Sequence, residues 1–231
     1  MGIDNVLQEV SELTSRVLQF TSGIHLPRGN HWPMLVSVNL TQGNERLHSV
    51  RLLLKNNYLE SADILTRSLF EIAVNLTYIS KDVSGRLPEY LKHGKVPTTK
   101  EEAEKLQREL EGLGKSGQLE AAQHIVPHQS WRVVRVMCDD LGQSWLREYT
   151  TFYAYTSVSS HAGAFTLSKN YERLLKEQPP SDQEKAAILV TALDFHLRVV
   201  DIAAWVFPLQ IKPETVKKLN SECQNLGKSL V

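Results

Sequence analysis

The residues of this chain that could most readily do chemistry form a polar stripe on one face of a predicted helix. The stripe consists of Arg67, Glu71, Asn75 and Tyr78, which follow one another at intervals of four, four and three residues. Residues at these intervals share one face of an α-helix. An arginine can hold a phosphate or carboxylate through two parallel hydrogen bonds, and a neighbouring glutamate can orient its guanidinium. The stripe therefore predicts anion binding by Arg67, with Glu71 and Asn75 as further binding candidates.

A second polar series occurs later in the chain and contains a histidine. Tyr149, Tyr153, Ser157 and His161 recur at every fourth residue, so on a helix they turn slowly around one face. Histidine is the most frequent general acid or base in enzymes. One hypothesis is therefore a metal-independent RNA phosphodiesterase, in which His161 transfers a proton at the ribose hydroxyl and Arg67 stabilises the charged transition state. In this hypothesis Tyr153 and Ser157 position the phosphate, and Arg67 must lie within reach of His161.

Two other functions are consistent with the same residues. In the first, the groove between the two predicted helices holds a small anionic ligand or a partner peptide, and Arg67 anchors it. In the second, the polar side chains satisfy one another inside a bundle, and the protein acts through a homodimer surface built from a helical hairpin. The 26 basic residues equal the 26 acidic residues, which removes the general positive field that attracts RNA. A binding or regulatory module is therefore favoured over a nuclease.

Several other motifs resemble known sites but lack the context that those sites need. Residues 112–117 read Gly-Leu-Gly-Lys-Ser-Gly, yet a charged helix precedes them, whereas phosphate-binding loops follow a strand. His124 and His128 have the spacing of a helical metal pair, but a proline lies between them and no third ligand is close in sequence. Glu45 and His48 form one Glu-x-x-His copy, and a di-iron bundle needs two. No metal and no cofactor is predicted.

A charged group lies within the most apolar segment, residues 186–207. Asp194, Arg198 and Asp201 occupy positions i, i+4 and i+7 of this segment. The spacing predicts a buried ion pair that fixes the register of a helix. The segment is long enough to cross a bilayer, but these charges lie near its middle, where hydrocarbon would penalise them heavily. We therefore expect a buried helix and no contact with a membrane.

The elements that must position these residues are all predicted to be helices. Apolar residues recur at intervals of three and four, and no sustained alternation of period two is present. Helices are expected over residues 6–18, 34–55, 58–81, 131–141, 144–168, 181–207 and 213–226. Asn56 and Asn57 are expected to turn the chain so that the flanking helices form an antiparallel hairpin, and Ser181 with Glu184 to form a capping box. The predicted fold class is an all-α multi-helix bundle.

Residues 1–231 are predicted to form a single helical domain with a charged excursion in its middle. The excursion, residues 82–130, consists of short pieces interrupted by proline and glycine, with a highly charged helix over 100–111. A chain of 231 residues, 42% of them hydrophobic, is sufficient for one large core. Its two cysteines lie far apart, and the amino terminus lacks the apolar stretch of a signal peptide. A cytoplasmic protein is therefore expected.

Two motifs resemble those of a widespread bacterial family of uncharacterised helical proteins. The first is Arg67-Ser-Leu-Phe-Glu71, which matches R-S-L-x-E. The second is the Y-x-x-x-Y-x-x-x-S-x-x-x-H series that ends at His161, and Trp131 lies where that family's tryptophan-led helix begins. The resemblance covers roughly residues 52–166 and implies no assigned activity.

The chain is also distantly similar to the HEPN helical bundles, many of which are metal-independent ribonucleases or their inactive relatives. This similarity implies a HEPN-like bundle and, as an alternative to a binding module, a ribonuclease toxin or defence effector that uses Arg67 and His161. The chain departs from the HEPN pattern R-x4-6-H, because no histidine follows Arg67 at that gap. Arg86 and His93 have the gap, but Pro88 is expected to interrupt their helix.

Overall fold

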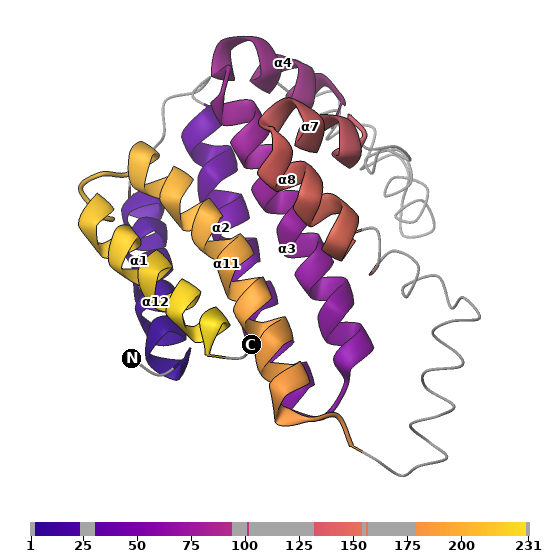
Figure 1. Cartoon of the computed structure of the whole chain (residues 1–231). Helices are drawn as coiled ribbons and strands as arrows, with labels where there is room; N and C mark the ends of the chain where they lie inside the picture. Colours follow the sequence, from indigo (N-terminus) through magenta and orange to yellow (C-terminus); the bar gives the residue numbers. More distant parts are fainter. Residues whose placement is uncertain are drawn as a thin grey trace, which may run out of the picture.

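Every element in the described part of the chain is a helix, as the apolar periodicity predicts (Figure 1). The computed structural model describes residues 3–23, 31–93, 101, 132–153, 156 and 179–229. Its elements are α1 (Ile3–Gly23), α2 (His31–Lys55), α3 (Leu59–Ser80), α4 (Val83–His93), α7 (Val134–Leu141), α8 (Gln143–Glu148), the π-helix η1 (Tyr149–Tyr153), α11 (Asp182–Val206) and α12 (Pro213–Lys228). None of these helices is long and apolar enough to span a membrane.

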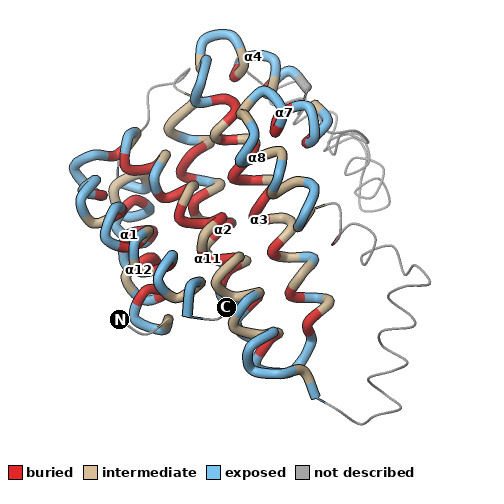
Figure 2. The backbone as a smooth tube through the Cα atoms, in the orientation of Figure 1, coloured by how far each residue is buried: buried red, intermediate tan, exposed pale blue. Residues whose placement is uncertain are grey.

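The core of the bundle lies between α2, α3 and α11, which contact one another over most of their length. Helix α1 packs beside α2, and α12 packs on α11 (Figure 1). The buried residues face this centre, whereas the outer sides of α1 and α12 are exposed (Figure 2). Helix α3 is buried on most of its circumference, because α2, α11 and α7 all pack against it. A polar residue on α3 is therefore held among neighbouring helices unless it points along one narrow exposed strip.

The turn between α2 and α3 confirms the predicted hairpin. Asn57 adopts a left-handed backbone conformation with φ of 64°, which asparagine tolerates better than most residues. The Tyr58 amide donates to the Leu53 carbonyl over 2.9 Å, and the Asn57 amide donates to the Leu54 carbonyl over 3.1 Å. These two bonds form a Schellman motif, which satisfies the last carbonyls of α2 and reverses the chain.

Helix α11 begins at the capping box that the sequence predicts. The Glu184 amide donates to the Ser181 hydroxyl over 3.1 Å, and the Ser181 amide donates to the Glu184 carboxylate over 3.0 Å. Further along, α11 approaches α2 closely at Gly43. A Cβ atom at Gly43 would lie 2.5 Å from Nδ1 of His196, so glycine is required where these helices meet.

The helix expected over residues 144–168 is not a uniform α-helix. Gly142, with φ of 108°, separates α7 from α8, and α8 then changes into the π-helix η1 at Tyr149. A π-helical turn closes i→i+5 hydrogen bonds, and single turns of this kind often occur at functional sites. The wider turn places Tyr149 directly over Tyr153, with ring centroids 5.2 Å apart and planes at 25°. Apolar periodicity does not distinguish the two helix types, so the sequence did not predict this change.

The predicted excursion begins with a regular helix, α4, and the expectation that Pro88 interrupts it was wrong. Helix α4 continues through Pro88 to residue 93. A proline inside a helix costs about 3 kcal/mol. Leu87 and Leu91 are buried with Ile79 in a small separate cluster, and burying a leucine contributes roughly 1.5–3 kcal/mol, which offsets that cost. Apart from Glu101, the charged helix expected over 100–111 lies outside the described residues, and the single-domain organisation stays a prediction.

Candidate functional site

Three of the predicted site residues meet between α3 and η1. The Nη2 atom of Arg67 donates to the Tyr153 hydroxyl over 3.0 Å, and that hydroxyl donates to Oε1 of Glu71 over 2.8 Å. The Nε atom of Arg67 lies 3.3 Å from the same Glu71 oxygen. Arg67 and Glu71 are one turn apart on α3, whereas Tyr153 comes from the end of η1. The three side chains, which we call the Arg67 cluster, therefore link two helices distant in sequence.

Aromatic packing fixes the position of Tyr153 in this cluster. Phe70 is fully buried, and its ring lies 5.5 Å from that of Tyr153 and 5.0 Å from that of Phe195 on α11. On its other side Tyr153 stacks against Tyr149. The guanidinium carbon of Arg67 lies 4.5 Å from the Tyr153 ring centroid, within the range of a cation–π contact. The phenol is therefore held by packing before its hydroxyl makes any hydrogen bond.

Partial burial keeps the Tyr153 hydroxyl protonated. Removal from water raises its pKa to about 12, and the Glu71 carboxylate adds to this rise, while the hydrogen bond from Arg67 opposes it. At neutral pH the hydroxyl is thus a hydrogen-bond donor and acceptor, and it is neither a base nor a nucleophile. Chemically, the Arg67 cluster offers one fixed cation, one carboxylate and one neutral donor.

The other two members of the polar stripe have different surroundings. The Nδ2 atom of Asn75 donates to the backbone carbonyl of Glu71 over 2.8 Å, one turn earlier on α3. Tyr78 is 2% exposed and lies in the interior of the bundle. Its hydroxyl donates to Asp140 over 3.1 Å, and the guanidinium carbon of Arg86 lies 3.7 Å from its ring centroid. Tyr78 faces α7 and α4, which sequence spacing on α3 alone could not reveal.

The remaining predicted site residues, Ser157 and His161, lie outside the described residues. The distance between Arg67 and His161, on which the ribonuclease hypothesis depends, therefore stays untested. Trp131, His124, His128 and the glycine-rich segment 112–117 also lie outside them.

The charged group on α11 pairs with a helix that the sequence did not indicate. Arg198 donates to Asp194 over 2.7 Å, as expected, and makes two further bonds of 2.6 and 2.7 Å to Glu148 on α8. Its side chain is 27% exposed, so the group is half-buried and not fully buried. Asp201 makes no ion pair with any residue that the structure describes, and its inclusion in the pair was wrong. Glu148 comes from 50 residues earlier in the chain, so no local spacing rule indicates it as a partner of Arg198.

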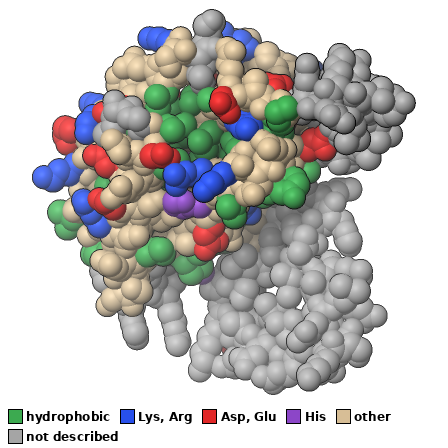
Figure 3. Space-filling view, turned by 90° about the horizontal axis from the view of Figure 1, so that it is seen from below, with side chains coloured by type: hydrophobic (Ala, Val, Ile, Leu, Met, Phe, Trp, Pro, Cys, Tyr) green, Lys and Arg blue, Asp and Glu red, His purple; other side chains and the backbone are tan. Residues whose placement is uncertain are grey.

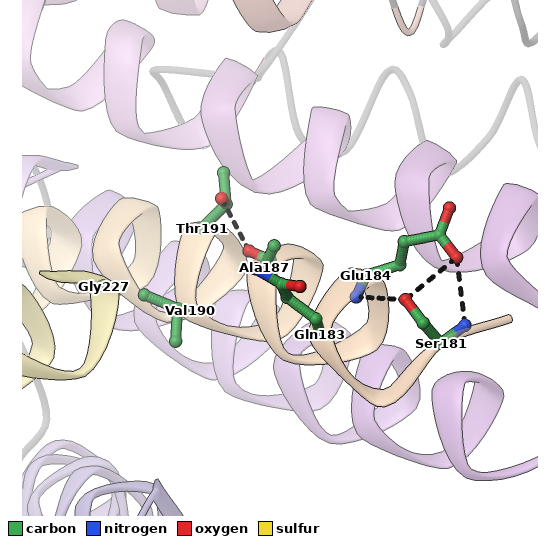
Figure 4. A pocket seen from close by; sticks show the side chains of 7 residues that line it. All are labelled: Ser181, Gln183, Glu184, Ala187, Val190, Thr191 and Gly227. Carbon is green, nitrogen blue, oxygen red and sulfur yellow. Dashed lines mark hydrogen bonds between the residues drawn. The ribbon is translucent and has the colours of Figure 1, made fainter. Parts of the chain in front are cut away.

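A pocket of about 360 Å³ lies near the start of α11, beside the last turns of α12 (Figure 4). Its most polar side chains, Ser181 and Glu184, bond each other in the capping box, and Thr191 bonds the carbonyl of Ala187. These bonds account for the polar groups of Ser181, Glu184 and Thr191 as parts of helix structure. We therefore assign no ligand to this pocket.

The surface in Figure 3 shows the end of the bundle where α11 begins. Hydrophobic side chains gather near the middle of its described part, and basic and acidic side chains are mixed around them. Proteins that bind nucleic acid through its phosphates usually present clustered basic residues. The described part of this face has no extended basic patch.

The comparison with known sequences places these features in an uncharacterised group. The profile of a family described as "Family of unknown function (DUF5677)" matches residues 34–178, which is more than half of the chain. No curated protein and no solved structure matches the chain significantly. The match confirms the predicted relationship to a family without assigned function. The HEPN-like assignment stays a prediction, because no solved structure supports it.

Proposed function

The chain belongs to the DUF5677 family, whose function is unknown, and we propose that it is a binding or regulatory module whose site is built on the Arg67 cluster. The proposed ligand is a small anionic group, a phosphate or a carboxylate. The observation that carries this proposal is the contact of Arg67 on α3 with Tyr153 on η1. Arg67 comes from the first polar series of the sequence, and Tyr153 comes from the second.

The first support is that Arg67 is both held in place and accessible. Its side chain is 22% exposed, so part of it faces solvent, while its Nε atom is buried. The hydrogen bond to Tyr153, the ion pair with Glu71 and the ring contact restrict its rotamers. A pre-positioned guanidinium loses less conformational entropy on binding a planar oxyanion than a free one does.

The second support is the position of Glu71. Its side chain is 38% exposed, and its carboxylate forms an ion pair with the guanidinium of Arg67. An arriving anion takes the place of that carboxylate, because both compete for the same donors. The neutral hydroxyl of Tyr153 then donates to the bound anion without electrostatic repulsion. Glu71 thus sets the affinity of the site, and Asn75, Ser157 and His161 are proposed to complete its lining.

The proposal is tested by calorimetric titration of the full chain with inorganic phosphate. We expect saturable binding to the wild type, and a loss of about tenfold or more in affinity for Arg67→Lys, which keeps the charge but removes the two-pronged donor. Glu71→Gln removes the competing carboxylate and is expected to tighten binding several-fold. Arg51→Lys, in an exposed pair with Asp4, is the matched control. Equal affinities in all four proteins would reject the site.

The ribonuclease alternative is distinguished by a separate assay. It requires His161 close to Arg67 and predicts cleavage of single-stranded RNA in the presence of a metal chelator. Cleavage by the wild type that is lost in both Arg67→Lys and His161→Gln, with folding retained, would replace the binding module by an enzyme. We also propose that the bundle is HEPN-like and that the chain forms a homodimer. Light scattering of the purified chain tests whether it is a dimer.

A further inference from the structure

A second pocket, distinct from the Arg67 cluster, lies at the end of the bundle where α3 and α11 finish. Its volume is about 520 Å³, within the range of small-molecule sites. Six helices, α2, α3, α4, α8, α11 and α12, contribute to its lining. The side chains that matter for its chemistry are Trp32, Trp145, Trp205, Lys81, Arg198 and Asp201.

Aromatic rings form its walls. Three of the four tryptophans of the chain line this pocket. Trp205 is 84% exposed, although its neighbours Ala203 and Ala204 are buried. An exposed indole at the rim of a pocket, with Trp32 inside it, is suited to a planar or apolar group of a ligand. The Trp145 ring already makes a cation–π contact, because the guanidinium carbon of Arg198 lies 4.5 Å from its centroid.

Two residues of opposite charge in the lining, Lys81 and Asp201, have no ion-pair partner among the described residues. Arg198 is neutralised by its bonds to Glu148 and Asp194, so it forms part of the wall. Lys81 and Asp201 are both exposed, and neither makes an ion pair or a side-chain hydrogen bond with the described residues. The pocket therefore presents, beside aromatic rings, an ammonium and a carboxylate that no described residue pairs with.

We infer that this pocket binds a free aromatic amino acid in its zwitterionic form. The carboxylate of the ligand pairs with Lys81, its ammonium group pairs with Asp201, and its ring lies against Trp205 and Trp32. A ligand with both charges satisfies both residues. A nucleotide would place its negative charges near Asp201, and an aromatic amine would leave Lys81 without a partner, so both fit the pocket less well.

The test uses three probes that share one ring and differ only in charge. L-Phenylalanine is zwitterionic, phenethylamine carries only the ammonium group, and 3-phenylpropionate carries only the carboxylate. None of them fluoresces when tryptophan is excited selectively, so the tryptophans of the pocket report binding. We expect a saturable change with L-phenylalanine and affinities about tenfold weaker for the other two, because each lacks one charge-assisted contact.

Two charge variants separate the roles of the pocket residues. Lys81→Met is expected to weaken L-phenylalanine binding about tenfold and to leave phenethylamine unchanged. Asp201→Asn is expected to weaken L-phenylalanine similarly and not to weaken 3-phenylpropionate. Lys217→Met, an exposed lysine that does not line the pocket, is the control. Thermal unfolding verifies that each variant folds.

Three results would overturn the inference. The first is the absence of any fluorescence change with L-phenylalanine in the folded wild type. The second is equal affinity for the three probes, which would mean that the two charges play no part. The third is tighter binding of adenosine monophosphate than of L-phenylalanine, strengthened further by Asp201→Asn, which would assign the pocket to a nucleotide.

Discussion

Arg67 and Tyr153, 86 residues apart in sequence, are joined by a 3.0 Å hydrogen bond from Nη2 of the arginine to the phenol oxygen. The same phenol donates a hydrogen bond to Glu71, so one hydroxyl connects both charged residues of the cluster. This bridge ties α3 to the π-helical turn η1. It gives the cluster a structural role in addition to any ligand that it binds, and the two roles predict different measurements.

Removing the bridging hydroxyl tests the structural role. Tyr153→Phe keeps the ring packing on Phe70 but leaves Arg67 and Glu71 without their common partner. We expect the free energy of unfolding in urea to fall by about 1–2 kcal/mol. Tyr58→Phe, at a tyrosine that is 62% exposed, is the control and is expected to change nothing. Equal stabilities of the two variants would contradict the bridge.

The α8–α11 ion pair is expected to contribute more than an exposed pair of the same length. Arg198 lies 2.6 Å from Glu148 at 27% and 26% exposure, whereas Arg51 lies 2.7 Å from Asp4 at 49% and 69%. Glu148→Gln should lower the free energy of unfolding by about 1–3 kcal/mol, because it leaves Arg198 partly unpaired away from water. Asp4→Asn should cost at most about 1 kcal/mol. If chemical denaturation shows similar losses of unfolding free energy for the two variants, the Arg198 pair is no more stabilising than the exposed Arg51 pair, which would contradict this prediction.

Because of its buried His196, the protein is expected to lose unfolding free energy in mild acid. Both of its ring nitrogens are buried without a hydrogen-bond partner among the described residues, and burial, with the nearby His48, lowers its pKa to about 3. An unfolded histidine titrates near 6.5, so between these values the unfolded state binds more protons and folding weakens as pH falls. The slope from this group is at most about 1.4 kcal/mol per pH unit.

The variant His196→Leu isolates this contribution. Its stability curve between pH 6.5 and 5 should be flatter than that of the wild type, since it lacks the proton-binding group. His31→Gln, at the start of α2, is the control for the loss of a histidine elsewhere in the chain. Parallel curves for the wild type and His196→Leu would rule out the proposed origin of the acid sensitivity.

The two cysteines should be unreactive in the folded protein. Cys138 and Cys223 are buried, and removal from water raises the pKa of each thiol to about 12, with nearby carboxylates adding to the rise. The thiolate is the reactive form, so a disulfide reagent at pH 8 should label both cysteines slowly until denaturant is added. Rapid labelling of either thiol under native conditions would contradict this burial.

The hairpin turn depends on the left-handed conformation of Asn57. Asn57→Ala should destabilise the protein by about 1 kcal/mol, because alanine resists a positive φ. Asn57→Gly should match or exceed the wild type, since glycine adopts this conformation freely. The midpoints of urea unfolding compare the three proteins, and an alanine variant as stable as the glycine variant would remove the turn from the explanation of the hairpin.

Local signals predicted much of this fold. The asparagine pair marked the α2–α3 turn, and Ser181 with Glu184 marked the start of α11, because both motifs act over a few residues. The Arg67–Glu71 pair was also readable, since residues four apart on a helix are neighbours. The periodic apolar pattern located α2, α3, α7, α11 and α12 to within a few residues of their observed bounds, but it did not predict α4.

Relationships between helices were not readable in the same way. Glu148 as the partner of Arg198 and Asp140 as the partner of Tyr78 depend on how α8 and α7 pack, and no spacing rule encodes that. The π-helical turn at Tyr149 shares its apolar pattern with an α-helix. Tyr153 was predicted as a site residue, but its hydrogen bonds to both Arg67 and Glu71 required the packed structure.

The most direct measurement of the proposed site follows the Nε–H resonance of Arg67 by NMR during titration with inorganic phosphate. The resonance is assigned by its loss in Arg67→Lys. We predict a saturable shift that occurs at lower phosphate concentration in Glu71→Gln than in the wild type, since the competing carboxylate is gone. A resonance that stays fixed in both proteins up to high phosphate concentration, with the fold intact, would contradict anion binding by the Arg67 cluster.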